Sequence, residues 1–230
     1  MRSGTLLPFV GLAAGLVLSA SPPRAHGQEQ AKFEKIKFET FDSVELQGSY
    51  WASTKGKKAP CAILLHKFGG KSHEDGWDDL AEGLQKLGFA VLSFDFRGHG
   101  DSTNVGDDFW KNPINQRFIR NYKPGSLKQP TSISQGDFNS MYIPYLVNDI
   151  AAARAFLERK NDNGECNVGN TVLIGAEEGA TLGLLWLTFE TYRHQVIFPP
   201  GRPSSKPESK DIAACVWLSM NKTMGKNLLC

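Results

Sequence analysis

Residues 171–185, with the sequence TVLIGAEEGATLGLL, place two adjacent carboxylates inside a turn framed by glycines. An aliphatic and β-branched run precedes Gly175 and an apolar run follows Gly179, so we expect a buried strand that turns sharply into a helix. Glu177 stands in the middle of that turn. A strained backbone at such an apex holds the side chain where it can meet a substrate.

Polar side chains also follow two other aliphatic runs. His66 and Lys67 come directly after the run at 61–65, in the sequence LLHKFGGKS. The sequence FDFRGHGDS, at 94–102, follows a second run and contains Arg97 and His99. Carboxyl ends of parallel strands meet at one edge of a sheet, so we expect these side chains near the same edge as the acidic turn.

These three segments, in this order and at these separations, resemble the α/β-hydrolase family over about residues 33–221. The resemblance implies an oxyanion hole whose donors are the backbone N–H groups of Phe68 and Glu178. It also implies that Gly175 and Gly179 are the small residues flanking the nucleophile position, which is Glu177. Small residues are needed there because side chains would clash where strand and helix meet.

Glu177 departs from the family pattern. An acyl-transfer hydrolase of this kind needs Ser or Cys at the apex, activated by His. Some relatives use Asp to form an alkyl-enzyme ester, but Glu is longer and would misplace its oxygen by about a bond length. Glu178 adds like charge, which hinders burial of an ionised nucleophile. We therefore favour a site that has lost catalysis over a Glu177 nucleophile.

Lys67 also departs from the pattern, because the family often has Gly after the histidine. We expect His66 and Lys67 at the mouth of the pocket, with a structural role for His66 in the turn. Two placements of Lys67 stay open. It either pairs with Glu177 or Glu178 across the pocket mouth, or it points to solvent.

The acid and base of a catalytic triad are not evident. Downstream of the acidic turn stand His194, at the end of the expected helix, and Asp211, at the wrong edge of the last strand. We expect both on the surface. Upstream, His66 and His99 do not match the family's base, and the side chains of 95–101 are expected to brace their own loop.

The elements that position these residues alternate along the chain. We expect a hairpin at 35–53, strands at 61–66, 89–96, 171–176 and 211–220, and helices at 77–88, 145–160 and 179–194. This order predicts an α/β fold, with a mostly parallel sheet, helices on both faces and an antiparallel hairpin at the start. The helix at 77–88 should bury a stripe that includes Leu87.

The family's sheet continues for two further strands beyond the last strand expected here. We therefore expect that strand to be an exposed apolar edge, through which the chain could pair with a partner. A natural short form and an early end of the reading frame both stay open.

Residues 103–141 lack a sustained periodicity and alternate aromatic with basic side chains. This excursion leaves the strand edge where the family binds ligands, so it could fold over the presumed site and hold an anionic or aromatic group. The alternative, which we favour, is a surface loop whose aromatic side chains pack on the domain.

Residues 1–27 have the form of a signal peptide, with Arg2, an apolar run and the small-residue cleavage motif at 25–27. We expect export, without a stable membrane span after cleavage, and a mature single domain at 28–230. Such a compartment allows disulfides. The family's strand order places Cys61 and Cys166 near the starts of neighbouring strands, where a disulfide is geometrically feasible.

Composition narrows the function further. A net charge of +2 over 230 residues is too mild to indicate nucleic acid as a partner. The cysteine spacing matches no zinc pattern, and we expect neither a metal nor a cofactor. Three functions remain: a noncatalytic hydrolase-fold protein with a small-molecule ligand or a structural role, an active hydrolase of ester or amide bonds, and a carboxylate-nucleophile hydrolase that uses Glu177.

Overall fold

The structure is a computed structural model of the chain, and it describes residues 1, 33–196, 207–221, 223–224 and 227–228. Except for Met1, the predicted signal peptide at 1–27 lies outside the described residues. With η for a 3₁₀-helix, the elements are β1 (Glu34–Glu39), β2 (Glu45–Trp51), η1 (Gly56–Lys58), β3 (Pro60–Leu65), α1 (Trp77–Lys86), β4 (Ala90–Phe94), η2 (Phe109–Lys111), α2 (Pro113–Phe118), η3 (Gln135–Asp137), η4 (Ser140–Leu146), α3 (Val147–Asp162), β5 (Asn167–Ala176), α4 (Glu178–Val196), η5 (Glu208–Asp211), β6 (Ile212–Leu218), β7 (Thr223–Met224) and β8 (Asn227–Leu228).

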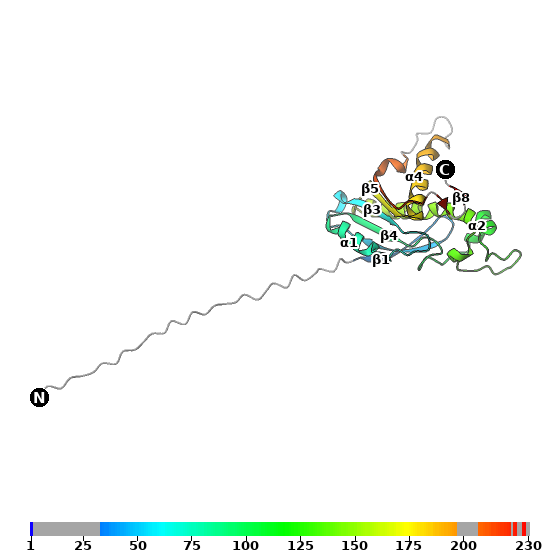
Figure 1. The fold of residues 1–230 in the computed structure, drawn as a ribbon, viewed down its shortest axis with the longest axis horizontal. Helices are drawn as coiled ribbons and strands as arrows, with labels where there is room; N and C mark the ends of the chain where they lie inside the picture. Colours follow the sequence, from blue (N-terminus) through cyan, green and yellow to red (C-terminus); the bar gives the residue numbers. More distant parts are fainter. Residues whose placement is uncertain (2–32, 197–206, 222, 225–226, 229–230) are drawn as a thin grey trace. The chain divides into compact units, whose positions relative to one another are not determined.

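Six strands of the described residues form one mixed sheet in the order β1-β2-β4-β3-β5-β6 (Figure 1). β1 and β2 form the predicted antiparallel hairpin, and β2 pairs antiparallel with β4. The pairs β4–β3, β3–β5 and β5–β6 are parallel. In register, Leu65 lies opposite Gly175, so the turn after β3 and the turn after β5 are neighbours. The predicted α/β fold is confirmed.

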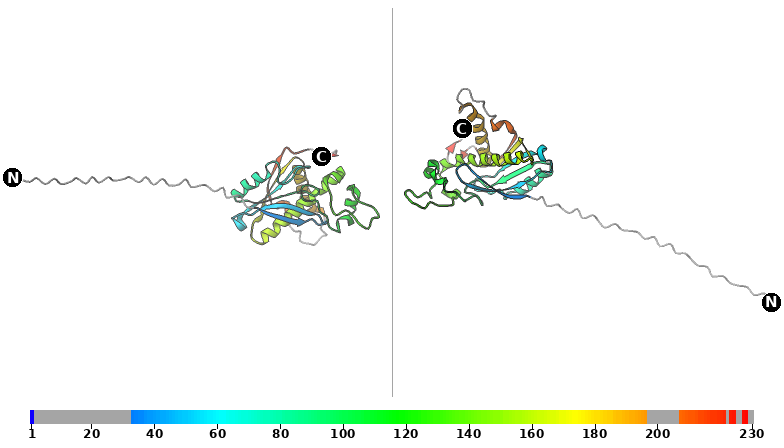
Figure 2. Two further views of the ribbon diagram at one scale, coloured as in Figure 1. Left: turned by 90° about the horizontal axis from the view of Figure 1, so that it is seen from below. Right: turned by 180° about the vertical axis from the view of Figure 1, so that it is seen from behind.

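Helices cover both faces of this sheet, as predicted (Figure 2). Leu157 of α3 and Trp186 of α4 belong to the core on one face, together with Ile63 of β3. Trp77 of α1 belongs to a second core on the other face, together with Leu64 of β3. Neighbouring residues of one strand are thus buried on opposite faces, which is why these strands are continuously apolar. No helix of the described segments is long and apolar enough to cross a membrane.

β6 is the last strand on its side of the described sheet, and Val216 and Leu218 are 42% and 48% exposed. The predicted exposed edge is therefore present. β7 and β8 pair with each other in a separate two-stranded sheet, which the sequence did not predict. Pairing of β6 with a partner stays a prediction.

α1 ends where its glycine predicted. It begins after Gly76, and Gly88 follows the C-cap with a left-handed backbone (φ 94°), a conformation that suits glycine. The predicted burial of Leu87 is wrong, because its side chain is 69% exposed. Leu87 is the C-cap residue, where the chain leaves the helix, and Lys55 Nζ donates a 2.8 Å hydrogen bond to its carbonyl.

The excursion at 103–141 packs its aromatic side chains on the domain. Phe109, Trp110 and Phe138 are buried in the larger core, and the ring of Tyr122 stacks on Trp110 at 5.4 Å. Trp110 Nε1 donates a 2.7 Å hydrogen bond to the Pro130 carbonyl. The favoured alternative for this segment is confirmed, and η2, α2 and η3 are short helices that its mixed composition concealed.

Cys61 and Cys166 are buried neighbours, as the strand order implied. They are free thiols in this structure, so the disulfide considered above is not formed. The two side chains lie within hydrogen-bonding reach of each other, and Cys166 Sγ lies 3.7 Å from the Leu157 carbonyl oxygen.

A buried ion cluster ties distant segments together. The Arg97 guanidinium donates two hydrogen bonds to Asp42, at 2.8 and 3.0 Å. It donates a third to Asp149, at 2.7 Å, and a fourth to the Tyr142 hydroxyl, at 2.9 Å. The side chains of Arg97 and Asp149 have no exposed surface. The expectation that Arg97 braces its own loop is therefore wrong, because its partners lie in the hairpin turn, η4 and α3.

The cluster holds two carboxylates for one guanidinium. Burial raises the pKa of Asp149 to about 6, against the lowering effect of Arg97. Burial also acts to raise the pKa of Asp42, but its contacts with Arg97 outweigh burial and lower it. The raised pKa of Asp149 therefore stabilises the folded protein at pH values below 3.8, the ordinary pKa of an aspartate. This stabilisation is lost as the pH rises through about 6. That of Asp42 is lost as the pH falls through its lowered pKa.

Replacement of Arg97 by Met keeps an unbranched side chain and removes the charge shared by both carboxylates. We expect the free energy of unfolding near neutral pH to fall by about 3–5 kcal/mol, because buried charges are left uncompensated. The loss should shrink in acid, since carboxyls without Arg97 have raised pKa values in the folded protein and take up protons. Urea denaturation of the original and variant proteins near neutral pH and in acid measures the loss of free energy of unfolding.

The matched control is Arg120→Met, on an exposed side chain of the excursion. It should change the free energy of unfolding by less than about 0.5 kcal/mol. Equal losses from the two variants would contradict the role given to the ion cluster.

Candidate functional site

Glu177 lies alone between β5 and α4, at the apex of the acidic turn. Its φ of 50° is left-handed, a strained conformation for a residue with a side chain. The Glu177 N–H donates to the Leu218 carbonyl at 2.9 Å, and its carbonyl accepts from the Thr181 N–H at 3.2 Å. These bonds to β6 and α4 hold the strained backbone, and the side chain is half-buried.

The glycines of the turn are required by close backbone approaches. A Cβ on Gly175 would lie 2.7 Å from the backbone of Ala180. A Cβ on Gly179 would lie 2.3 Å from the His66 carbonyl oxygen and 2.4 Å from that of Leu65. Real Cβ atoms do not come so close to backbone, so α4 can rest on the turn after β3 only if residue 179 is glycine.

Glu178 occupies the place that the resemblance gave to an oxyanion. Its Oε2 accepts a 3.3 Å hydrogen bond from the backbone N–H of Phe68, one of the two implied donors. Its Oε1 accepts a 2.8 Å hydrogen bond from Asn221 Nδ2. Asn221 is fixed in turn, because its carbonyl accepts from Thr181 Oγ1 at 2.6 Å. From the sequence, Glu178 was interpreted as a backbone donor, as a charge near Glu177 and as a possible partner of Lys67, but not as an acceptor for the Phe68 N–H.

His66 does not lie at the pocket mouth, so that prediction is wrong. It is 1% exposed, and its Nε2 accepts a 3.1 Å hydrogen bond from the Phe96 N–H. Its Nδ1 therefore carries the proton and donates to the Lys67 carbonyl at 2.7 Å. Burial lowers the pKa of His66 to about 4, so the ring is neutral at pH 7. With both nitrogens engaged, His66 supports the turn.

Lys67 lines the cavity described below, but its partner is neither of the two predicted residues, Glu177 and Glu178. Lys67 Nζ forms a 2.9 Å salt bridge with Asp75, just before α1. Hydrogen bonding to Asp75 raises the pKa of Lys67, and the charge of Glu177 adds to this effect. Lys67 therefore binds the segment before α1 and forms no salt bridge with Glu177 or Glu178.

The other predicted groups have structural partners. His99 is buried, with Nδ1 2.9 Å from the Arg97 carbonyl and its ring against Phe68, and burial lowers its pKa. Asp211 was expected to be a plain surface residue, but it accepts a 2.8 Å hydrogen bond from the buried Arg154. His194 lies within α4, and its side chain is outside the described part.

Besides His99, which contacts the Arg97 carbonyl, Asp95 braces its own loop, as predicted. It accepts hydrogen bonds from the N–H groups of Ser72, at 2.7 Å, and Asp101, at 3.0 Å. Among the described residues, no group of three or more His, Cys, Asp and Glu side chains is placed to hold a metal ion.

A cavity of about 250 Å³ opens beside Glu177, where α1 meets the carboxyl ends of β5 and β6. Its charged lining is Lys67, Asp75 and Glu177, and its other lining residues are Gly76, Trp77, Leu80, Ala176 and Leu218. Among the described residues, no histidine lines it, and no residue of the excursion at 103–141 does, so the excursion does not cover it. This cavity and the two acidic residues form the candidate site.

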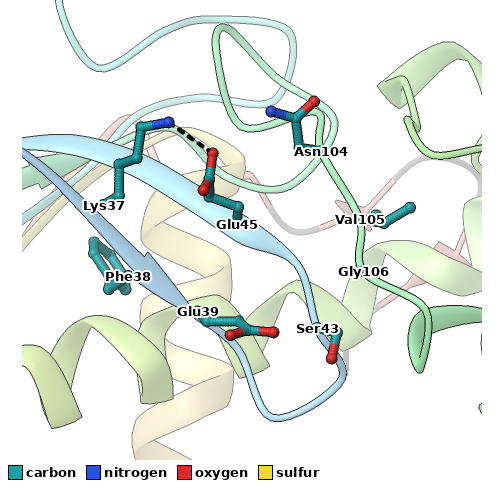
Figure 3. A pocket seen from close by; sticks show the side chains of 8 residues that line it. All are labelled: Lys37, Phe38, Glu39, Ser43, Glu45, Asn104, Val105 and Gly106. Carbon is teal, nitrogen blue, oxygen red and sulfur yellow. Dashed lines mark hydrogen bonds and ion pairs between the residues drawn. The ribbon is translucent and has the colours of Figure 1, made fainter.

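A larger cavity, of about 490 Å³, lies elsewhere, between the β1–β2 hairpin and residues 104–106 (Figure 3). Lys37 and Glu45 point toward each other across it and form a 2.9 Å salt bridge. Glu39 and Ser43 also line this cavity. It contains no histidine or cysteine, so we place the candidate site at Glu177 despite the difference in volume.

Gly179→Ala tests the close approach of α4 to the turn after β3. We expect a loss of about 1–3 kcal/mol in the free energy of unfolding, because the added methyl group overlaps two carbonyl oxygens. Gly83→Ala is the matched control, since its Cβ meets nothing within 4 Å in the middle of α1. It should stabilise by about 0.5–1 kcal/mol. Thermal melts of both variants decide, and a Gly179→Ala protein as stable as the original would contradict the packing described.

No family model and no curated protein sequence matches the chain. Solved structures do match. An α/β-hydrolase from Penicillium sp. sh18, GrgF, is 15% identical over 82% of this chain and 46% of its own, with a TM-score of 0.52. An esterase from Pyrococcus furiosus is 19% identical over 85% of this chain and 51% of its own, with a TM-score of 0.50. The chain thus spans about half the length of each. Together with the sheet order and the left-handed apex, these similarities establish that the chain has the α/β-hydrolase fold.

Proposed function

We propose that this chain is an exported hydrolase-fold protein that does not hydrolyse esters or amides at its nucleophile turn and uses the cavity there for binding. The observation that carries the proposal is the 3.3 Å hydrogen bond from the Phe68 N–H to the Glu178 carboxylate. Acyl transfer needs that donor for the negative oxygen that develops in the transition state. A carboxylate already bound there excludes the oxygen and repels it.

The apex residue supports the same proposal. Glu177 has no hydroxyl or thiol to transfer an acyl group, and no histidine lines the cavity beside it. The buried His66 has both ring nitrogens engaged, so it has no free nitrogen to take a proton from a nucleophile. The described lining of the cavity thus offers neither a hydroxyl or thiol nucleophile nor a histidine base, which supports the proposal.

A carboxylate-nucleophile hydrolase is the second candidate, and one observation favours it. The strained apex holds Glu177 at a cavity, as a nucleophile must be held. Attack by a Glu177 carboxylate oxygen on an epoxide carbon would break the ring C–O bond and give a hydroxyalkyl ester of Glu177, with the ring oxygen taking up a proton. A base-activated water must then cleave this ester. Of the two functions, binding requires fewer groups beyond those described.

Turnover of small aryl esters and epoxides separates these functions. We expect no turnover above background by the purified chain, and no change on Glu177→Gln. Incubation with an epoxide followed by intact-mass measurement should show no adduct, because Glu177 does not attack. Turnover or an adduct that disappears in Glu177→Gln would establish the second candidate. Turnover that persists in Glu177→Gln would establish an active hydrolase with other residues.

Export rests on residues 1–27 alone. The short apolar run and the small residues at 25–27 support cleavage before Gln28. Expression of the full chain in a secreting host, followed by N-terminal sequencing of the secreted protein, should give a chain that begins at Gln28. A cell-retained product with an intact N-terminus would contradict export.

A further inference from the structure

The segment that precedes and begins α1 is strongly acidic, and its Asp75 lines the Glu177 cavity. Residues 74–79 carry four carboxylates in six positions, while the chain as a whole has a net charge of +2. Lys67 and Lys71 form salt bridges with two of these carboxylates, Asp75 and Glu74, each at 2.9 Å. Lys67, the lysine of the described cavity lining, is therefore already paired.

Glu177 has no salt-bridge partner among the described residues. It lines the cavity together with Asp75. The carboxylate of the neighbouring Glu178 accepts hydrogen bonds from two uncharged groups, the Phe68 N–H and the Asn221 amide. Lys67 and Asp75 of the described lining neutralise each other, which leaves the charge of Glu177, and an excess of negative charge in a cleft concentrates cations. The cavity is thus suited to a cation.

The remaining walls are apolar. Trp77, Leu80, Ala176 and Leu218 line the cavity, so a ligand that fills it must carry an apolar body as well as a charge. The indole of Trp77 adds an aromatic surface, which attracts ammonium groups. A volume of about 250 Å³ lies below the usual range for drug-sized ligands, which indicates a small molecule.

We infer that the Glu177 cavity binds small amphiphilic amines, with the ammonium group at Glu177 and the apolar body against Trp77 and Leu80. The inference rests on the proposed function, because it treats the cavity as a binding site. It adds the chemical class of the ligand. No bond is made or broken on binding.

Isothermal titration calorimetry of the full chain with three ligands of similar shape tests whether binding requires a positive charge on the ligand. The probes are phenethylamine, phenethyl alcohol and phenylacetate, used up to millimolar concentrations at low salt. The amine should bind about fivefold more tightly than the alcohol, the gain expected of a half-exposed ion pair. Phenylacetate should bind least, and added salt should reduce the difference between amine and alcohol.

Two variants should move the amine preference in opposite directions. Glu177→Gln keeps the shape of the side chain and should make the amine and the alcohol bind equally. Lys67→Met removes a competing cation and frees Asp75, so it should strengthen binding of the amine. Glu82→Gln, on α1 but outside the cavity lining, is the matched control and should leave the preference unchanged. Melting curves establish that each variant is folded.

Three results would overturn the inference: no binding of the amine, equal binding of amine and alcohol by the unmodified chain, or an amine preference that survives Glu177→Gln. A misfolded Glu177→Gln variant leaves the decision to Lys67→Met, where weaker amine binding contradicts the inference. The ester and epoxide assays report separately on the proposed function. The two tests are therefore independent. Amine binding can be absent from a noncatalytic chain, and turnover can be present with or without amine binding.

Discussion

The guanidinium of Arg97, buried between Asp42 and Asp149, is the interaction on which the ligand-facing edge of the sheet depends. It joins the β1–β2 turn, the loop after β4 and the start of α3 in a region without access to water. The same loop contains Asp95, whose carboxylate binds the Ser72 N–H. The residues that follow His66 are thereby fastened to a turn that is itself fixed by the ion cluster. The ion cluster of Arg97, Asp42 and Asp149, which does not line the cavity, thus affects the geometry of the candidate site.

A second constraint acts at the site, where α4 begins almost in contact with the turn after β3. Gly179 permits that approach, because its missing side chain leaves room for two carbonyl oxygens. The approach sets the distance between the first residue of α4 and the Phe68 N–H. Glu178 is long enough to cover it, whereas a shorter side chain would leave the donor open. The close approach of α4 and the hydrogen bond of Glu178 to the Phe68 N–H therefore have the same geometric origin.

The sequence predicted the six strands of the main sheet and the helices α1, α3 and α4 in the correct order, because aliphatic runs and glycine stops are local signals. It did not predict η2, α2, η3, β7 or β8. It could not predict Lys67–Asp75 or the long-range partners of Arg97, since ion pairing depends on which charged groups the finished fold brings together. Nor could it predict the contact of Glu178 with Phe68, which depends on the depth of helix packing. Asn221, the second partner of Glu178, has no sequence signal of its own. Leu87 failed for a simpler reason, because the helical period was extended one residue beyond the last turn.

Glu178 belongs to the same chain as the N–H group that it binds, and this makes it a tethered competitor. Its effective concentration at that donor is set by the backbone, so dilution of the protein cannot lower it. A free carboxylate or a developing oxyanion has to displace Glu178 before it can use the donor. A cation has no such competitor there and is attracted by the same charge. The internal carboxylate therefore disfavours an anion at the Phe68 N–H group.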